Sequence, residues 1–330
     1  MDTGVIPNPT IVFIGGSGRS GTNITKEILG QHPDVATLPF EYRFIIDPNG
    51  LIDFYNSVNA SWSPYFIDSK IKQLEYFLLT LATKSSDKTI LSRRKPFIKT
   101  RSAEHWYKEW ELEKWIPDYT RFVNQLISEL SDFTYSAKWP GLPESHPEEK
   151  MYFSAKRGTE LRGILGRFIY RCVNAILSDQ NKSVFVEDNT WNILFAKELL
   201  ELCPSGKILH VMRDPRDVVA SLRQQRWTPG NLLAVLRWYK GVMTRWEHVK
   251  SSLGETQFIE IKFEALVQNT EPILKELCSF IHLSFQEVLL DISLDKAHIH
   301  RWQSDFTEEE KVIIEKELKS QVQKYGYHFK

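Results

Sequence analysis

The sequence contains few cysteines, no excess of either charge and no long apolar run, and these shortages exclude several classes of protein. Its three cysteines, Cys172, Cys203 and Cys278, are too widely spaced to suggest a disulfide framework or a zinc ribbon. The 42 lysine and arginine residues balance 42 aspartate and glutamate residues, which removes the usual basis for binding nucleic acid. No stretch of about 18 apolar residues is present, and the N-terminus lacks the basic region of a signal peptide. We therefore expect a cytoplasmic protein with no transmembrane anchor and no nucleic-acid partner.

Enough apolar sequence remains for a large core, and its pattern indicates the fold class. Hydrophobic residues make up 42% of the chain and charged residues 25%, which is the balance of an ordered globular protein. Short runs of β-branched and aromatic residues predict buried strands at Thr10–Ile14, Ser183–Val186, Lys207–Met212 and Phe258–Ile261. Because helical patterns follow these strands, we predict an α/β fold with a central parallel sheet flanked by helices. Ligands of such folds bind at the carboxyl ends of the strands.

The region between residues 46 and 182 lacks this alternation of strands and helices. Amphipathic stretches around residues 70–82 and 118–130 predict helices there instead. We therefore interpret residues 46–182 as a helical insertion.

A glycine-rich loop follows the first predicted strand and precedes a helix. Residues Gly16–Gly21 satisfy the pattern G-x-G-x-x-G, and Glu41 lies 20 residues further on, as in a dinucleotide-binding fold. The same residues satisfy the glycine spacing of a P-loop, but Thr22-Asn23 stands where a nucleotide triphosphatase needs Lys-Ser/Thr, so ATP or GTP hydrolysis is disfavoured. Backbone N–H groups and the helix dipole converge at such a turn and favour an anion. The loop thus predicts a phosphate site, and Arg19 within it fits a dinucleotide fold poorly.

A second strand-turn-helix unit lies at residues 207–222. Asp214 and Pro215 have the residue types of an N-cap and a first helical position. Arg213 leaves the strand end, and Ser221 falls about two turns into the helix, so both side chains could reach one phosphate.

The two anion motifs together resemble those of the sulfotransferases that use 3′-phosphoadenylyl sulfate (PAPS). Gly18–Asn23 resembles the 5′-phosphosulfate loop of that family, and Val211–Leu222 resembles its 3′-phosphate motif. Weaker similarities occur at Glu187–Asn192, where Asp188-Asn189 replaces the usual lysine, at Ile261–Leu266, and at Arg301-Trp302, where the glycine-rich form of the closing loop is absent. The resemblance covers residues 10–45 and 183–330. It implies a P-loop-like sulfotransferase fold, a single domain over residues 1–330 whose insertion at about 46–182 binds the acceptor.

The resemblance also implies roles for individual residues. PAPS would be the donor and adenosine 3′,5′-bisphosphate (PAP) the product, and no metal would be needed. The residues implied to bind the donor are Gly18, Arg19, Ser20, Gly21, Thr22 and Asn23 at the 5′-phosphosulfate, and Arg213, Ser221 and Arg301 at the 3′-phosphate. Arg19 would stabilise the charge that develops on the departing phosphate.

The general base follows from the branch of the family that the chain resembles. Glu41 comes shortly after the first helix, as does the glutamate base of the tyrosylprotein and carbohydrate branches. Arg43 would orient this carboxylate or the acceptor, and His32, which precedes a proline at a helix end, is the weaker candidate for the base. The basic residues between Arg93 and Arg101 are interpreted as a solvated loop rather than a site for an anionic acceptor.

The sequence leaves the acceptor and some rival functions open. We predict transfer to a hydroxyl of a small organic molecule or a sugar, with an amine, a tyrosine or a lipid as alternatives. A nucleotide kinase or a dinucleotide enzyme would use the same glycine loop. A protein that binds a nucleotide without catalysing a reaction would also have this phosphate site. The oligomeric state is not indicated.

Overall fold

The computed structural model of the chain describes residues 8–82, 111–294 and 297–328. Contacts within the chain group into two compact units. The sheet unit consists of Thr10–Glu41, Lys182–Leu200 and Ser205–Lys330. The helical unit consists of Met1–Pro9, Tyr42–Asn181 and Glu201–Pro204. No helix of the described ranges is long and apolar enough to cross a membrane.

The sheet unit is built on a five-stranded sheet in which every neighbouring pair is parallel. The strands, in their spatial order, are β2 (Val35–Ala36), β5 (Val184–Asp188), β1 (Thr10–Gly16), β6 (Gly206–Met212) and β7 (Phe258–Lys262). The central strand β1 is apolar on both faces because both are covered, as parallel sheets require. The four predicted strands are therefore confirmed, with ends that differ from the prediction by one or two residues, and the two-residue strand β2 is an addition.

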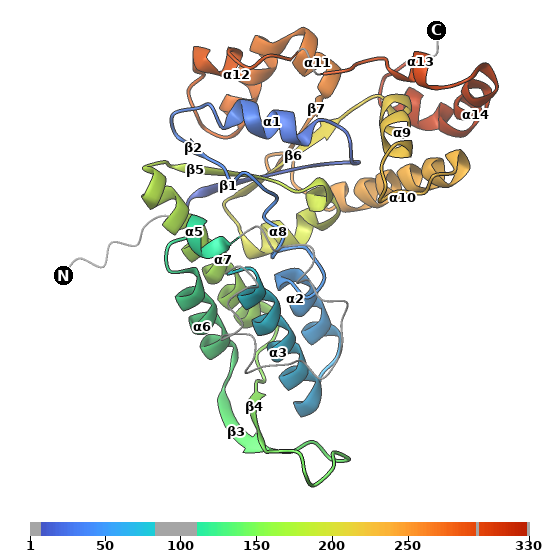
Figure 1. Ribbon diagram of the computed structural model, residues 1–330. Helices are drawn as coiled ribbons and strands as arrows, with labels where there is room; N and C mark the ends of the chain where they lie inside the picture. Colours follow the sequence, from blue (N-terminus) through green and yellow to red (C-terminus); the bar gives the residue numbers. More distant parts are fainter. Residues whose placement is uncertain (1–7, 83–110, 295–296, 329–330) are drawn as a thin grey trace. The chain divides into compact units, whose positions relative to one another are not determined.

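Helices cover both faces of this sheet (Figure 1). One face packs against α1 (Thr22–Leu29), α11 (Phe263–Gln268) and α12 (Thr270–Phe280). The opposite face packs against the short 3₁₀ helix η2 (Thr190–Phe195) and the long helix α10 (Leu232–Lys250). Val12 and Ile14 of β1 belong to the first core, and the alternation of side chains along a strand sends Phe13 to the other.

Two of the remaining helices of the sheet unit begin at side-chain caps. The remaining helices are α8 (Ala196–Leu202), α9 (Pro215–Arg223), η3 (Glu287–Leu290), α13 (Trp302–Asp305) and α14 (Glu308–Lys324). Asp214 caps α9 by accepting from the backbone N–H of Arg216, and Thr307 and Glu310 form a capping box at the start of α14. After β5 the chain first forms η2 and becomes α-helical at Ala196.

The helical unit packs its long helices around a buried aromatic cluster. Its elements are α2 (Leu51–Ala60), α3 (Pro64–Thr80), α5 (Leu112–Trp115), α6 (Tyr119–Leu130), β3 (Phe133–Ala137), β4 (Glu149–Phe153) and α7 (Gly158–Gln180). The ring centroids of Phe44, Tyr119 and Phe168 lie 5.6–6.3 Å apart. The antiparallel pair β3–β4 departs from the purely helical prediction, and it is attached to α3 where Asp68 accepts from the backbone N–H of Tyr152 at 2.8 Å. The basic residues 93–101 lie outside the described ranges.

Candidate active site

The glycine loop between β1 and α1 has a backbone that depends on its glycines. Gly18, Arg19 and Gly21 have φ angles of 83°, 58° and 104°, in the left-handed region that glycine adopts without strain. A Cβ atom at Gly21 would lie 2.3 Å from a ring carbon of Phe263, so the approach of α11 also requires glycine there. Left-handed residues interspersed in a turn point backbone N–H groups into a concave surface that binds anions. The loop and the N-terminus of α1 together form such a surface.

Two buried polar atoms at this loop have no partner among the described residues. The hydroxyl of Ser20 is fully buried and makes no hydrogen bond, and the same holds for the Nε atom of Arg213. Buried donors are rarely left unpaired in folded proteins, because each costs free energy comparable to a lost hydrogen bond. Both atoms are donors, so the group that fits them is an acceptor such as a phosphate or sulfate oxygen. Thr22 and Asn23 begin α1, where Thr22 is half-buried and Asn23 exposed.

The two anion motifs meet in the structure. The Nε atom of Arg19 donates to the hydroxyl of Ser221 on α9 at 3.0 Å. Arg213, at the end of β6, donates to the backbone carbonyl of Arg19 at 3.0 Å. β1 and β6 are neighbouring parallel strands, so their carboxyl ends lie on one edge of the sheet. The predicted 5′- and 3′-phosphate residues thus form one continuous cluster.

Three arginines concentrate positive charge at this cluster. The pKa of Arg19 is lowered by burial and then by the positive charges of Arg213 and Arg301. Arg213 and Arg301 have acidic neighbours, Asp217 at 3.5 Å and Asp305 at 2.6 Å. In the part of the chain that the structure describes, no carboxylate lies within ion-pair distance of Arg19. A cation that its positive neighbours repel favours a bound anion.

Asp217 holds the C-terminal segment against α9, and the sequence motifs did not reveal this role. Its carboxylate accepts from the backbone N–H groups of His300 at 2.7 Å and Trp302 at 3.0 Å. The Trp302 ring in turn lies 4.1 Å from the guanidinium of Arg216, measured to the ring centroid. These contacts place Arg301 near Arg19. The position of Asp217, in the first turn of α9 and four residues after Arg213, is the signal that could have identified it.

A buried ion pair lies at the end of β5, and it was also missed. The ammonium of Lys26 on α1 lies 2.6 Å from a carboxylate oxygen of Asp188 and donates to the carbonyl of Leu38 at 3.1 Å. Burial raises the pKa of Asp188, Lys26 opposes this, and the negative charge of Glu41 adds to the rise. The half-buried Glu41 therefore lies within electrostatic reach of Asp188.

The remaining candidates for the base and its orienting residue have other partners. His32 is buried; its Nε2 atom lies 2.8 Å from the carbonyl of Ser284, and its Nδ1 atom accepts from the backbone N–H of Asp34. Both ring nitrogens are occupied, so His32 has a structural role. Arg43 belongs to the helical unit, where its guanidinium lies 3.6 Å from Asp47.

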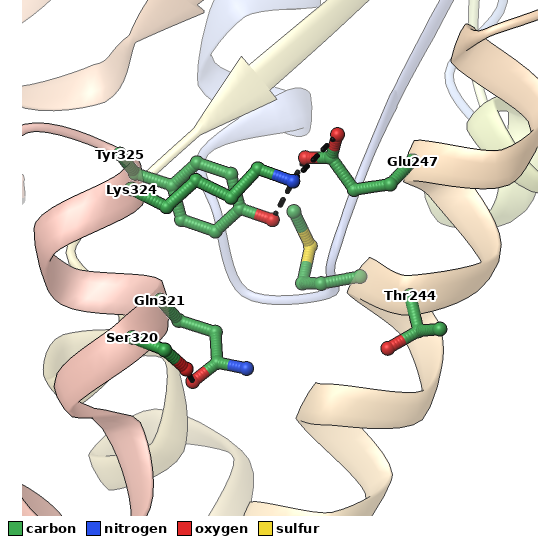
Figure 2. A pocket seen from close by; sticks show the side chains of 7 residues that line it. Thr244, Glu247, Ser320, Gln321, Lys324 and Tyr325 are labelled. Carbon is green, nitrogen blue, oxygen red and sulfur yellow. Dashed lines mark hydrogen bonds and ion pairs between the residues drawn. The ribbon is translucent and has the colours of Figure 1, made fainter.

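A separate pocket lies between α10 and α14 (Figure 2). It is lined by Met243, Thr244, Glu247, Ser320, Gln321, Lys324 and Tyr325. Figure 2 shows Lys324 and Tyr325 directed at Glu247, with which they interact at 2.9 and 3.1 Å. No predicted site residue lines this pocket, and its charged residues Glu247 and Lys324 pair with each other.

The chain is similar to known proteins in its sequence and in its fold. Residues 9–287 match the sulfotransferase family. The sulfotransferase domain from the olefin synthase of Synechococcus PCC 7002 is 14% identical, with 98% of this chain and 97% of that chain covered and a TM-score of 0.50. The sulfotransferase domain from the curacin biosynthetic pathway is 12% identical, with 98% and 99% covered and a TM-score of 0.49. Retinol dehydratase in complex with androsterone and inactive cofactor PAP is 13% identical, with 97% and 82% covered and a TM-score of 0.38. The comparison with curated proteins found no match.

The likeness to the olefin synthase domain confirms the predicted fold class. The chain is a single α/β domain with a central parallel sheet flanked by helices, of the P-loop-like sulfotransferase type.

Proposed function

The chain belongs to the sulfotransferase family, and from that premise we propose that it transfers a sulfuryl group from PAPS to a hydroxyl group. The observation that supports this proposal is that the cations Arg19 and Arg213 and the hydroxyl of Ser221 lie in one cluster. A donor with phosphate groups at two positions needs two anion sites within one molecule's reach, and this cluster joins two such sites. The acceptor class is a small organic molecule or a sugar, and residues 46–182 are proposed to contribute to its pocket.

The residues at the cluster fit the donor. The loop N–H groups and the unpaired hydroxyl of Ser20 would bind the 5′-phosphosulfate, and Arg19 would stabilise negative charge on the leaving phosphate oxygen. Ser221 and the unpaired Nε of Arg213 would hold the 3′-phosphate, and Arg301 would add charge. When bound, PAPS supplies the sulfuryl group for an in-line displacement that needs positioning and charge stabilisation.

Glu41 is proposed as the general base that removes the proton of the acceptor hydroxyl. It lies near the buried pair of Lys26 and Asp188, at the same edge of the sheet as the glycine loop. Two carboxylates close together repel each other. The ammonium of Lys26, which pairs with Asp188, would offset part of this repulsion. Arg43, two residues after Glu41 in the sequence, would orient the acceptor.

Calorimetry of PAP binding tests the donor site. The wild-type protein should bind PAP, and Arg213→Ala should weaken binding at least tenfold because it removes a charged donor to phosphate. The matched control Arg245→Ala, at an exposed position of α10, should bind PAP as the wild type does. No binding of PAP by the wild type would refute the proposed function, and unchanged binding by Arg213→Ala would place the 3′-phosphate elsewhere.

A second variant tests the base. Glu41→Gln should bind PAP normally and should lose about 100-fold or more in sulfuryl transfer, the usual contribution of a general base. Transfer would be followed with labelled PAPS and a mixture of hydroxyl acceptors. Undiminished turnover by Glu41→Gln would exclude Glu41 as the base.

A further inference from the structure

Three tryptophans of the sheet unit form a cluster with an exposed ring. The ring centroids of Trp191 and Trp227 lie 6.5 Å apart, those of Trp191 and Trp238 6.4 Å, and those of Trp227 and Trp238 6.0 Å. Trp227 is 49% exposed, although it is the largest kind of apolar side chain. Its exposed ring rests against the rings of its two partners. We call these three residues the tryptophan platform.

The platform borders the glycine loop. A Cβ atom built on Gly18 would lie 3.6 Å from the ring of Trp227, 3.6 Å from the methyl group of Thr190 and 3.5 Å from a methyl group of Leu222. Trp227 therefore lies directly beside the residue that precedes Arg19. All three neighbouring atoms are carbon, so this side of the loop is a hydrocarbon surface next to a cluster of cations.

The platform is also connected to the proposed base. Thr190 and Trp191 lie two and three residues after Asp188 in the chain, and the negative charge of Glu41 contributes to the raised pKa of Asp188. An acceptor hydroxyl must lie between the base and the sulfuryl group. The body of that acceptor would then lie along the segment that leads from Asp188 to Trp191 and onto Trp227.

We propose that the tryptophan platform binds the apolar ring of the acceptor, and that the acceptor is therefore a flat apolar alcohol such as a phenol. This proposal rests on the proposed function and names its substrate class. A ring stacked on Trp227 removes apolar surface of both partners from water, which is favourable without any hydrogen bond. Any hydroxyl group of a sugar that turned toward these carbon atoms would lose its hydrogen bonds to water without gaining a partner, which costs free energy.

The test uses 2-naphthol as the probe and D-glucose as its polar counterpart, each titrated calorimetrically into protein saturated with PAP. Wild-type protein should bind 2-naphthol and not glucose. Trp227→Ala should weaken 2-naphthol binding about tenfold, the effect of one lost aromatic stacking contact, while PAP binding stays within twofold of the wild-type value. Trp227→Phe should recover most of the affinity because it keeps a flat ring, and Val312→Ala, at an exposed apolar residue of α14, should change nothing. Circular dichroism of each variant checks that it is folded.

Each other result overturns the proposal in a recognisable way. If Trp227→Ala weakens PAP rather than 2-naphthol, the platform holds the donor base. If wild-type protein with bound PAP does not bind 2-naphthol, or if Trp227→Ala and Trp227→Phe bind it like the wild type, the platform does not hold the acceptor. Absence of PAP binding by the wild type is a different failure, since it refutes the proposed function itself.

Discussion

Replacement of Glu260 by glutamine should remove a pH-dependent part of the stability of the sheet unit. Glu260 on β7 lies directly opposite His210 on β6, and its carboxylate lies 2.9 Å from the His210 Nδ1 atom. The same carboxylate accepts from the indole N–H of Trp246 at 2.9 Å and from the ammonium of Lys250, both on α10. Glu260 thus joins two strands to the helix that covers them.

The magnitude follows from the pKa of this carboxyl group. Burial pushes the pKa of Glu260 up, but the contacts with His210, Lys250 and Trp246 outweigh burial and lower the pKa from 4.5 to about 2. A depressed pKa stabilises the folded state above the pKa of the unfolded chain, and this stability is lost as the pH falls through the folded value. A fall in this pKa from 4.5 to about 2 on folding adds about 3 kcal/mol to the unfolding free energy at pH 7. More than half of this contribution should be lost at pH 3.

Urea unfolding followed by far-ultraviolet circular dichroism between pH 7 and pH 3 measures this contribution. The difference in unfolding free energy between wild type and Glu260→Gln should be largest at pH 7 and should shrink steadily below about pH 4.5. As a control, Glu271→Gln removes an exposed ion pair with Lys275 and should change the unfolding free energy by less than about 1 kcal/mol. A difference between wild type and Glu260→Gln that stays constant from pH 7 to pH 3 would refute the reasoning.

Two further substitutions test the loop and the attachment of the last helix. Gly21→Ala should lower the unfolding free energy in urea by about 2 kcal/mol or more and weaken PAP binding, because φ is 104° and the new Cβ would strike Phe263; Gly230→Ala, which has open space around it, should be nearly neutral, and equal effects at both glycines would contradict this explanation. Tyr325→Phe should cost about 1 kcal/mol, because the hydroxyl donates to Glu247 at 3.1 Å (Figure 2); an unchanged thermal midpoint would show that this hydrogen bond contributes nothing.

The local sequence was sufficient to predict most of the sheet unit. The strand Thr10–Gly16 is buried on both faces, so its sequence is almost wholly apolar, and Gly206–Met212 is apolar except at Lys207 and His210. Glycines at positions that need a left-handed backbone identified the loop, and Asp214-Pro215 identified the start of α9. The meeting of Arg19 with Ser221 could also be anticipated, because carboxyl ends of parallel strands share one edge.

Contacts between distant residues could not be read from the sequence in the same way. The pair formed by Lys26 and Asp188 joins a helix to a strand more than 160 residues away in the sequence. No sequence motif indicates that these two residues are partners. The β3–β4 pair was missed because its outer strand, Phe133–Ala137, is almost wholly exposed and carries no buried pattern. The roles of Glu41 and Arg43 stay predictions, since they depend on an acceptor that the sequence does not identify.

The carboxylate of Asp217 fastens the C-terminal segment to α9 and makes it a structural part of the sheet unit. This side chain is fully buried, and two of its hydrogen bonds come from the backbone at His300 and Trp302. Shortening the chain before His298 would leave a buried negative charge without these donors, at a cost of about 3 kcal/mol or more. It would also release Arg213, which donates to the carbonyl of His298. Engineers who trim or fuse this protein at its C-terminal end should therefore leave residues 298–302 intact.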